Sequence, residues 1–457
     1  MSENHSNKMG TMPVGKLLFN MALPITISML FQALYNIVDS YFVAQLNQDA
    51  MNAVSLSFPM QSLLIGFAIG TGVGMSALIS RALGERKPER ANEIAGTGIF
   101  LYFCLAVLFS VIGFTLVRWY FSIQTKNENI IRYGTQYLTT VMGVSVFLFF
   151  QVCFERLLQS TGRSDKSMIS QLSGAVVNMI LDPLFIYGIW IFPRLEVWGA
   201  AVATVIGQCV AMTIGLTLNI RCNKDLTLSF KQIRFRSRIF KDIYAIGLPS
   251  ILMQTIGSFT NFFMNRILIG FTEAATAVYG AYFKLQSFFF MPVFGLNNGM
   301  VPIVSYNYGA ARLDRVKETY KLSVITAVSI MLVGFALFMG IPHVLIGIFK
   351  PSEEMLAIGV RALRIICLHF LFAGFCIISG SMCQAIGNPM HSLIISIFRQ
   401  VVGLLPSAYL LSLTGDLDMV WFCFPIAEVF SLVFSIIFLR KTMKNAEARI
   451  GASAQQG

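Results

Sequence analysis

The sequence predicts an all-α polytopic membrane protein, with twelve transmembrane helices in two six-helix lobes that are related by a parallel internal repeat. Three observations predict this fold. The chain has 457 residues, of which 56% are hydrophobic and only 12% are charged, whereas soluble domains carry about 25% charged residues. Many apolar segments reach the roughly 20 residues that a helix needs to cross a bilayer. The two halves of the sequence also match each other at one fixed shift.

Polar residues, glycines and prolines divide the chain into helical segments. Leu322 to Ile341 is a typical segment, because it contains no Asp, Glu, Lys or Arg. The predicted helices are 17–44, 52–80, 94–120, 130–152, 168–192 and 197–219 in the first half, and 240–268, 277–303, 318–348, 354–380, 390–413 and 419–440 in the second. The predicted organisation is therefore an N-terminal lobe at 1–220, a basic cytoplasmic linker at 221–241 and a C-terminal lobe at 242–457.

The two halves align without gaps over a long stretch when they are shifted by 225 residues. The matches include prolines, glycines, amides and charged residues, which chance similarity between apolar segments does not readily produce. They include Pro24 with Pro249, Gln61 with Gln286, Gly70 with Gly295, Gly74 with Gly299, Arg90 with Arg315, Gln159 with Gln384 and Gly162 with Gly387. Six helices per repeat is an even number, so both halves enter the membrane from the same side, as in transporters with parallel repeats.

Lysines and arginines set the expected orientation, because cytoplasmic loops of membrane proteins collect them. Segments on the side of the N-terminus and the linker carry 24 of these residues, and segments on the other side carry 7. We therefore expect both termini in the cytoplasm. The same bias explains the net charge of +12, so no nucleic-acid partner is expected. Met1 to Lys16 has no apolar core ahead of a cleavage site, and no removable signal peptide is expected.

The sequence shows no pattern that is typical of an enzyme or a metalloprotein. None of the eight cysteines forms a C-x-x-C pair, and the four histidines show no metal-ligand spacing, so free packed thiols and no bound metal are expected. The sequence contains no Walker A motif, no G-x-S-x-G motif and no convincing nucleotide-binding loop. We expect neither a cofactor nor ATP-driven activity.

Two aspartates lie inside predicted helices of the first half. Asp39 belongs to the first helix, and Asp182 to the fifth, four residues after Asn178 and on the same helix face. A charge at the centre of a membrane costs at least about 2.5–3.5 kcal/mol, so each acid calls for an explanation. The repeat pairs Asp39 with Met264 and Asp182 with Ser407, so the acids are not part of the shared scaffold. The functional interpretation is a proton or cation site, and the alternative is a pair of acids that hydrogen-bond to Asn or Ser for packing.

Aromatic, methionine and polar residues within the helices are candidates for a substrate cavity, although most such residues face lipid or pack helices. The candidates are Tyr35, Asn36, Phe147, Phe150, Tyr279, Tyr282, Phe283, Lys284, Met291 and Glu428. Lys284 and Glu428 have a structural alternative, in which they pair and neutralise each other. Arg266 and Arg399 have another, in which their side chains reach a membrane interface.

The chain resembles the multidrug and toxic compound extrusion (MATE) transporters over nearly its whole length. The resemblance rests on Leu23-Pro24 and Leu248-Pro249 at the start of the two halves, on Asp39, and on the segments 159–162, 384–387 and 177–183. The sequence is most similar to the bacterial branch related to the DNA-damage-inducible F proteins. The resemblance implies a V-shaped pair of lobes and a cation site in the N-terminal lobe made of Asp39, Asn178, Asp182 and Thr204. Another branch of the family carries acids in the seventh and tenth helices. In this chain the seventh helix has Arg266 and no acid, and the tenth helix has no acid after Glu354.

These observations together predict a secondary antiporter that exports drugs or organic cations in exchange for H⁺ or Na⁺, by alternating access between two lobes. We expect a monomer in the bacterial inner membrane, with the lipid bilayer and small-molecule substrates as its partners. The alternative is a flippase for a lipid-linked or lipid-like substrate, for which Arg266, Lys284 and Arg399 would be the residues to test. A channel or receptor would leave the acid pair of the first half unexplained.

Overall fold

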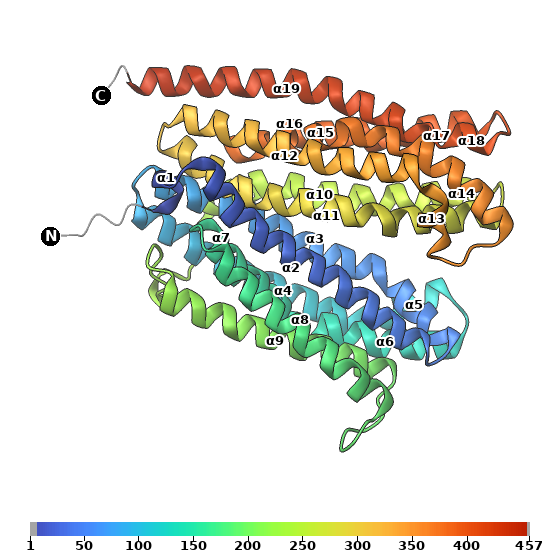
Figure 1. Ribbon diagram of the computed structural model, residues 1–457. Coiled ribbons are helices and arrows are strands. Elements are labelled where there is room, and N and C mark those ends of the chain that lie inside the picture. The colour runs from blue at the N-terminus through green and yellow to red at the C-terminus, as the bar shows by residue number, and fades with distance from the viewer. Residues whose placement is uncertain (1–6, 455–457) are drawn as a thin grey trace. The chain divides into compact units, whose positions relative to one another are not determined.

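The computed structural model describes residues 7–454, and within this range it contains helices and their connections but no strand (Figure 1). The elements of the first half are α1 (Lys8–Thr11), α2 (Val14–Ala44), α3 (Gln48–Gly84), α4 (Pro88–Thr115), α5 (Val117–Gln124), α6 (Glu128–Gly143), α7 (Val146–Ser160), α8 (Ser164–Tyr187), α9 (Val197–Cys222) and the short η1 (Phe230–Gln232). Those of the second half are α10 (Ser237–Leu268), α11 (Glu273–Gly309), α12 (Leu313–Gly340), α13 (Pro342–Gly347), α14 (Glu353–Ile366), η2 (Cys367–His369), α15 (Phe370–Ile386), α16 (Pro389–Ile397), the π-helix η3 (Phe398–Leu404), α17 (Leu405–Ser412), α18 (Leu417–Val420) and α19 (Cys423–Ala454).

The helices are long and apolar enough to cross a membrane many times. Eleven spans among the described residues meet this requirement, and the pair α6 and α7, bent by 45°, makes a twelfth if it is counted as one span. The predicted all-α fold class is confirmed. The bend is the main difference within a predicted helix, because 130–152 falls across the break at residues 144 and 145.

The internal repeat is confirmed in the helix boundaries. α3 at Gln48–Gly84 and α11 at Glu273–Gly309 differ by 225 residues at both ends, as do α4 and α12. Side-chain contacts follow the same shift. Ser80 Oγ donates to the Ser160 carbonyl at 2.8 Å, and Ser305 Oγ donates to the Ala385 carbonyl at 2.9 Å. The matched serines therefore link equivalent helices, α3 to α7 in the first half and α11 to α15 in the second.

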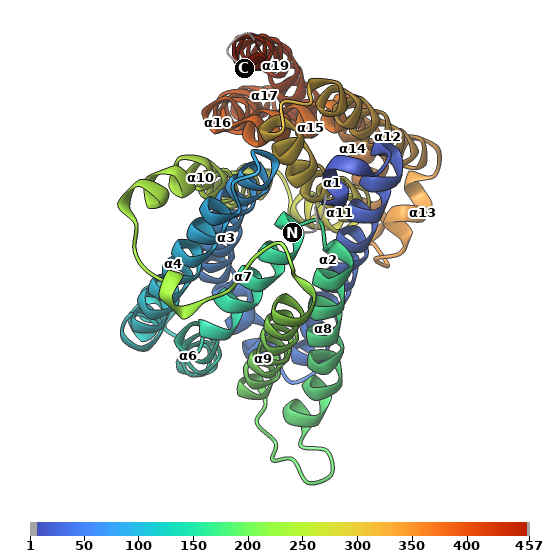
Figure 2. The ribbon, with the colours of Figure 1, turned by 90° about the vertical axis from the view of Figure 1, so that its left-hand side faces the viewer.

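The described residues divide into two compact units. The first unit comprises residues up to Thr11 together with Leu23–Ile251, and the second comprises Met12–Ala22 together with the residues from Leu252 on. The lobe boundaries predicted at residues 220 and 242 stay a prediction. Among the helices of the first unit, α8 and α9 lie side by side in both ribbon views (Figures 1 and 2).

Glycines allow this close packing of α8 and α9. A Cβ atom at Gly174 would lie 2.6 Å from the Gly207 carbonyl oxygen, and one at Gly207 would lie 2.7 Å from the Gly174 carbonyl oxygen. Real Cβ atoms do not approach an oxygen so closely, so glycine is required at both positions. Small residues at helix interfaces are the common way in which membrane helices approach each other.

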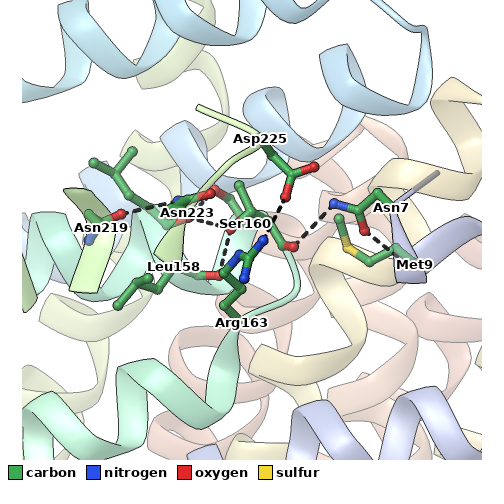
Figure 3. Close-up of polar contacts among 10 residues, drawn as sticks. Asn7, Met9, Leu158, Ser160, Arg163, Asn219, Asn223 and Asp225 are labelled. Carbon is green, nitrogen blue, oxygen red and sulfur yellow. Dashed lines mark hydrogen bonds and ion pairs between the residues drawn. The ribbon is translucent and has the colours of Figure 1, made fainter. Parts of the chain in front are cut away.

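The start of the predicted linker is tied to the first unit by polar contacts (Figure 3). Asn223 donates from Nδ2 to Asn219 Oδ1 at 3.1 Å, and Arg163 pairs with Asp225 at 3.5 Å. Asn7, near the beginning of the described chain, donates to the Thr161 carbonyl at 3.2 Å. The turn between α7 and α8 thus binds both the N-terminal segment and the first residues after α9.

The predicted end of the fourth helix is wrong. The sequence prediction stops at residue 152 and leaves Arg156 in an aqueous loop, whereas α7 continues to Ser160. Glu155 and Arg156 lie within the helix, and side-chain amides of the same helix form hydrogen bonds with both. Gln151 donates to Glu155 at 3.0 Å, and Arg156 donates to Gln159 at 3.1 Å.

Candidate functional site

The structure brings three of the four predicted cation-site residues into direct contact. Asn178 and Asp182 lie on α8, and Thr204 faces them from α9. The Asn178 Nδ2 group donates to Asp182 Oδ1 at 3.2 Å and to Thr204 Oγ1 at 3.4 Å. The four-residue spacing on one helix face and the close α8–α9 packing together create this arrangement.

Asp39, on α2, completes the group through electrostatic interaction with Asp182. Both aspartates are buried, with 8% of Asp39 and 0% of Asp182 exposed. Asp39 Oδ1 and Asp182 Oδ2 are buried without a hydrogen-bond partner in the part of the chain that the structure describes. Two ionised carboxylates that interact in this way repel each other, and a proton or a small cation bound between them would remove the repulsion.

A small cavity adjoins Asn178 and Thr204 of this group, and neither aspartate lines it. It has a volume of about 50 Å³, which is enough for one or two water molecules or a small hydrated ion. Drug-sized ligands need pockets of about 300–1,000 Å³, so this cavity suits an ion. Its lining residues from α2, α7, α8 and α9 are Gln32, Tyr35, Leu148, Gln151, Gln171, Gly174, Ala175, Asn178, Thr204, Gly207 and Gln208.

Most of the polar residues that line the cavity were not predicted from the sequence. Four glutamines contribute to the cavity, and two of them, Gln171 and Gln32, hydrogen-bond each other at 3.4 Å. Glu155, a buried acid that is 6% exposed and bonded to Gln151, was not predicted either. Amides within otherwise apolar helices were the available signal, but they carry no charge and are therefore less conspicuous than aspartates.

The other candidates of the first unit have different surroundings. Tyr35 lines the cavity and interacts electrostatically with Asp39 and Asp182. Asn36 is exposed on α2. Phe147 and Phe150 are half-buried outside the residues that line the cavity, and the Phe150 ring lies 5.8 Å from that of Phe154. Phe150 thus packs within the helix bundle.

The aromatic candidates of the second unit form a packed cluster. Tyr279 and Tyr282 are 2% and 1% exposed. The Tyr279 hydroxyl donates to Asn261 Oδ1 at 2.9 Å, and the ring of Tyr282 lies 5.5 Å from that of Phe424. Phe283 and Met291 are half-buried. A role for these residues in substrate binding stays a prediction.

The predicted alternative pairing of Lys284 with Glu428 is wrong. Lys284 is exposed, and its Nζ atom lies 5.9 Å from the centre of the Phe349 ring. Glu428 is buried on α19 at 2% exposure and interacts electrostatically with Arg399. Arg399 is half-buried, and Arg266 is exposed near the end of α10. The sequence pattern suggested a pair because both groups lie in apolar context, but Lys284 is exposed whereas Glu428 is buried.

The candidate ion site contains no cluster that is typical of a transition-metal centre. Between residues 7 and 454, no three His, Cys, Asp or Glu side chains lie close enough together to hold a metal ion. The site offers carboxylate, amide and hydroxyl oxygens instead, and these are the ligands that hard cations prefer.

Comparison with known proteins identifies the family of this chain. The family model described as MatE matches residues 24–184 and 249–410, which is one match in each half and more than half of the sequence. The chain is 26% identical to "Multidrug export protein MepA" of Staphylococcus haemolyticus, over 89% of each protein. It is 28% identical to "FAD transporter" of Shewanella oneidensis, over 91% of this chain and 92% of that protein.

A solved structure shares the fold. It is described as the outward-facing conformation of a multidrug resistance MATE family transporter of the MOP superfamily. It matches 98% of this chain and 100% of its own with a TM-score of 0.91, at 24% identity. The predicted family is therefore confirmed: the chain belongs to the MATE family, whose members are multi-pass membrane transporters and not enzymes.

Proposed function

We propose that this transporter exports drugs or organic cations in exchange for H⁺ or Na⁺. The observation that carries the proposal is the buried pair Asp39 and Asp182, joined to Asn178 and Thr204 in the first unit. The two acids have buried oxygens that no group in the described chain satisfies. Relatives named as multidrug export proteins support the substrate class.

The acid pair suggests how ion and substrate compete. A proton or Na⁺ at the pair removes the repulsion between Asp39 on α2 and Asp182 on α8, and loss of the ion restores it. α2 contains Pro24 within its length, and a proline removes a backbone hydrogen bond and favours a bend. We propose that ion binding changes the bend of α2 and lowers the affinity for substrate, and by linkage the substrate lowers the affinity for the ion.

The proposal extends to the oligomeric state, the membrane and the orientation of the transporter. We propose a monomer in a bacterial inner membrane, with both termini in the cytoplasm, that works by alternating access between two lobes. The distribution of lysines and arginines supports the orientation. The internal repeat supports a mechanism in which one half moves against the other.

The test is efflux of ethidium from sealed vesicles under an imposed pH or Na⁺ gradient. Wild type is compared with Asp39→Asn and Asp182→Asn, and with Asp314→Asn as the control, because Asp314 is exposed in the first turn of α12. We expect uphill efflux that needs a gradient and disappears in both site variants but not in the control. Gradient-dependent efflux that persists in Asp39→Asn would contradict the proposed coupling mechanism.

A second candidate function is export of an anionic dinucleotide cofactor. The observation in its favour is the 28% identity to a protein named as an FAD transporter, which is above the 25–27% identity to the multidrug export proteins. The same vesicles loaded with FAD distinguish the two candidates. Gradient-dependent movement of FAD without movement of ethidium would favour the second. The flippase alternative stays a prediction, with Arg266, Lys284 and Arg399 as the residues to change.

A further inference from the structure

The cavity of the first unit is lined by amide oxygens that come from three helices. Gln151 Oε1 on α7, Asn178 Oδ1 on α8 and Gln208 Oε1 on α9 are buried, and none has a hydrogen-bond partner among the described residues. Buried acceptors without donors are costly, so a cluster of three calls for an explanation. Their meeting at one cavity indicates a ligand that attracts oxygen atoms.

Two of these oxygens are available because acidic side chains hold the other end of the amide. The NH₂ group of Asn178 is occupied by Asp182 and Thr204. The NH₂ group of Gln151 donates to Glu155 Oε1 at 3.0 Å. In its ionised form Glu155 can only accept hydrogen bonds. It then takes the NH₂ group of Gln151, and the Gln151 oxygen stays free for the cavity.

We propose that Glu155 is a positioning residue that holds the Gln151 amide and thereby makes the cavity an oxygen-lined site for a small monovalent cation. The inference rests on the proposed function, because the cavity shares Asn178 and Thr204 with the proposed ion-coupling site. Na⁺ and a hydrated proton share the required chemistry. The volume of about 50 Å³ admits either with a water molecule and is too small for an organic cation.

The surroundings of Glu155 allow this role. It is 6% exposed, and the charged or titratable groups that interact with it are Arg156 on its own helix and Tyr102 from α4. Arg156 is itself hydrogen-bonded to Gln159 at 3.1 Å, and the Tyr102 hydroxyl donates to the Ala68 carbonyl at 2.7 Å. Both neighbours therefore have structural partners of their own.

The internal repeat separates Glu155 from the shared scaffold. With the shift of 225 residues, Gln151 and Glu155 correspond to Cys376 and Gly380. By contrast, the bond from Gln159 to Ser167 at 2.9 Å recurs as the bond from Gln384 to Ser392 at 3.1 Å. The second half keeps the scaffold contact and lacks the amide–carboxylate pair, so the pair is not needed to build the helix bundle.

Protonation of Glu155 would reverse the orientation of the Gln151 amide. The protonated carboxyl can donate its O–H to the Gln151 oxygen, and the amide then turns its NH₂ group toward the cavity. A donor at this point repels a cation. The affinity of the cavity for Na⁺ should therefore fall when Glu155 binds a proton or is changed to glutamine.

The test measures cation-dependent thermal stabilisation of the full-length protein in lipid nanodiscs. NaCl is titrated against choline chloride at constant ionic strength, in wild type, Glu155→Gln, Gln151→Leu, the double variant and Asp182→Asn. Glu128→Gln is the matched control, because Glu128 is exposed on α6. We expect Glu155→Gln and Gln151→Leu each to weaken the apparent Na⁺ affinity at least about tenfold, since one charge-assisted hydrogen bond or one ligand is lost.

The double variant separates positioning from stability. Because Glu155 acts through Gln151, the double variant should bind Na⁺ no more weakly than Gln151→Leu alone. A purely structural Glu155 would lower the melting temperature in choline and leave the Na⁺ affinity unchanged, which would overturn the proposal. Additive losses in the double variant would overturn it as well.

The remaining outcomes distinguish this inference from the proposed function. If Na⁺ does not stabilise the wild type, the same series is titrated with pH in choline. A changed pH midpoint in Glu155→Gln then supports a proton ligand, and an unchanged midpoint overturns the proposal. Loss of Na⁺ affinity in Asp182→Asn with full affinity in Glu155→Gln overturns only the role of Glu155. Cation binding without gradient-driven efflux overturns the proposed antiport and leaves the ion site intact.

Discussion

Asn178 connects the two helices of the candidate ion site. Its amide reaches the Asp182 carboxylate at 3.2 Å and the Thr204 hydroxyl at 3.4 Å. When Asp182 is ionised the first bond has a charged acceptor, and such bonds contribute about 1.5–3 kcal/mol. The second is longer and neutral, so it contributes less.

We therefore expect unequal losses from variants of these two residues. Asn178→Ala should reduce gradient-driven efflux at least about tenfold, because 1.4 kcal/mol corresponds to a factor of ten. Thr204→Val should reduce it less than about threefold. Initial rates of ethidium efflux in vesicles measure both, normalised to the amount of protein. Equal losses, or a larger loss in Thr204→Val, would contradict the assignment of Asn178 as the connecting residue.

The two aspartates of the candidate site could be predicted from the sequence, and most of its uncharged residues could not. Asp39 and Asp182 were predictable because a carboxylate within a membrane is costly, and Thr204 was identified only through resemblance to the family. Gln32, Gln171 and the other cavity glutamines were not predicted. An amide costs less to bury than a charge, so only the three-dimensional meeting of several amides distinguishes them from packed polar residues.

The packing of α3 against α10 depends on glycine at residue 74. A Cβ atom there would lie 2.2 Å from the Ile243 carbonyl oxygen, a backbone atom that cannot move aside. Gly280 in α11 offers a matched control, because a Cβ atom there would meet nothing within 4 Å. Alanine is favoured over glycine in a helix by about 1 kcal/mol, whereas overpacking costs about 1–3 kcal/mol.

Alanine substitution at these two positions should therefore have opposite effects. Gly74→Ala should lower the thermal midpoint of the purified protein, and Gly280→Ala should leave it unchanged or raise it. Both midpoints are measured in the same detergent by light scattering or intrinsic fluorescence. A stabilised Gly74→Ala would show that α3 and α10 do not pack as closely as described.

The turn between α3 and α4 contains a pH-sensitive ion cluster. Glu85 pairs with Arg81 at 3.2 Å and with Lys87 at 3.0 Å. Partial burial raises the pKa of Glu85, but the hydrogen bond and charge of Lys87, with those of Arg81, outweigh it and hold the pKa below its usual range. The contribution of Glu85 to stability is thus present above its unfolded pKa of about 4.3 and is lost as the pH falls through the lower folded value.

We expect Glu85→Gln to be slightly less stable than wild type at pH 7, by no more than about 1 kcal/mol, because surface ion pairs are weak. The difference should close as the pH is lowered below about 4. Melting curves between pH 3 and pH 7 measure it, with Glu128→Gln as the control. A gap that persists at the lowest pH would exclude the ion cluster as its cause.

At the scale of elements, apolar length predicted nearly every membrane span, whereas local interruptions were not predictable. α7 runs through Glu155 and Arg156, and Gln151 and Gln159 of the same helix hydrogen-bond to them. Charged residues in an apolar segment predict a helix end because an unpaired charge is costly in a membrane, and the sequence alone does not show that these local amide partners are engaged. The π-helix η3 at Phe398–Leu404 also lies within a predicted continuous helix. Its extra residue per turn produces no gap in the apolar pattern, so periodicity alone does not reveal it.

The two halves of the chain repeat the same helices and scaffold contacts but carry different ionisable residues. The helix boundaries of α3 and α4 recur in α11 and α12, and scaffold contacts such as that of Ser80 recur with them. The acids Asp39, Asp182 and Glu155 do not recur. Packing constrains both halves in the same way, whereas one ion-coupling site suffices for a transporter, so the differences between the halves indicate where function lies.

The orientation of this scaffold in the membrane is a testable property of the whole chain. The side with the predicted linker carries 23 lysines and arginines once Arg156, which lies within α7, is left out of the predicted 24, and the opposite side carries 7. Such a bias fixes the orientation because positively charged segments stay in the cytoplasm. Lys224 and Lys444 should therefore face the cytoplasm, and Lys126 and Arg194 should face the outside.

Single cysteines at these four positions test the orientation in a background without the eight natural cysteines that still transports ethidium. We expect a membrane-impermeant maleimide to label Lys126→Cys and Arg194→Cys in cells whose inner membrane is intact. Lys224→Cys and Lys444→Cys should react only after the inner membrane is permeabilised. α6 and α7 count as one membrane crossing only if their 45° bend lies within the membrane. The side on which Arg194 lies therefore decides whether the total number of crossings is even or odd. Protection of Arg194→Cys together with reaction of Lys126→Cys would place the two sites on opposite sides, and the number of crossings between them would then be odd.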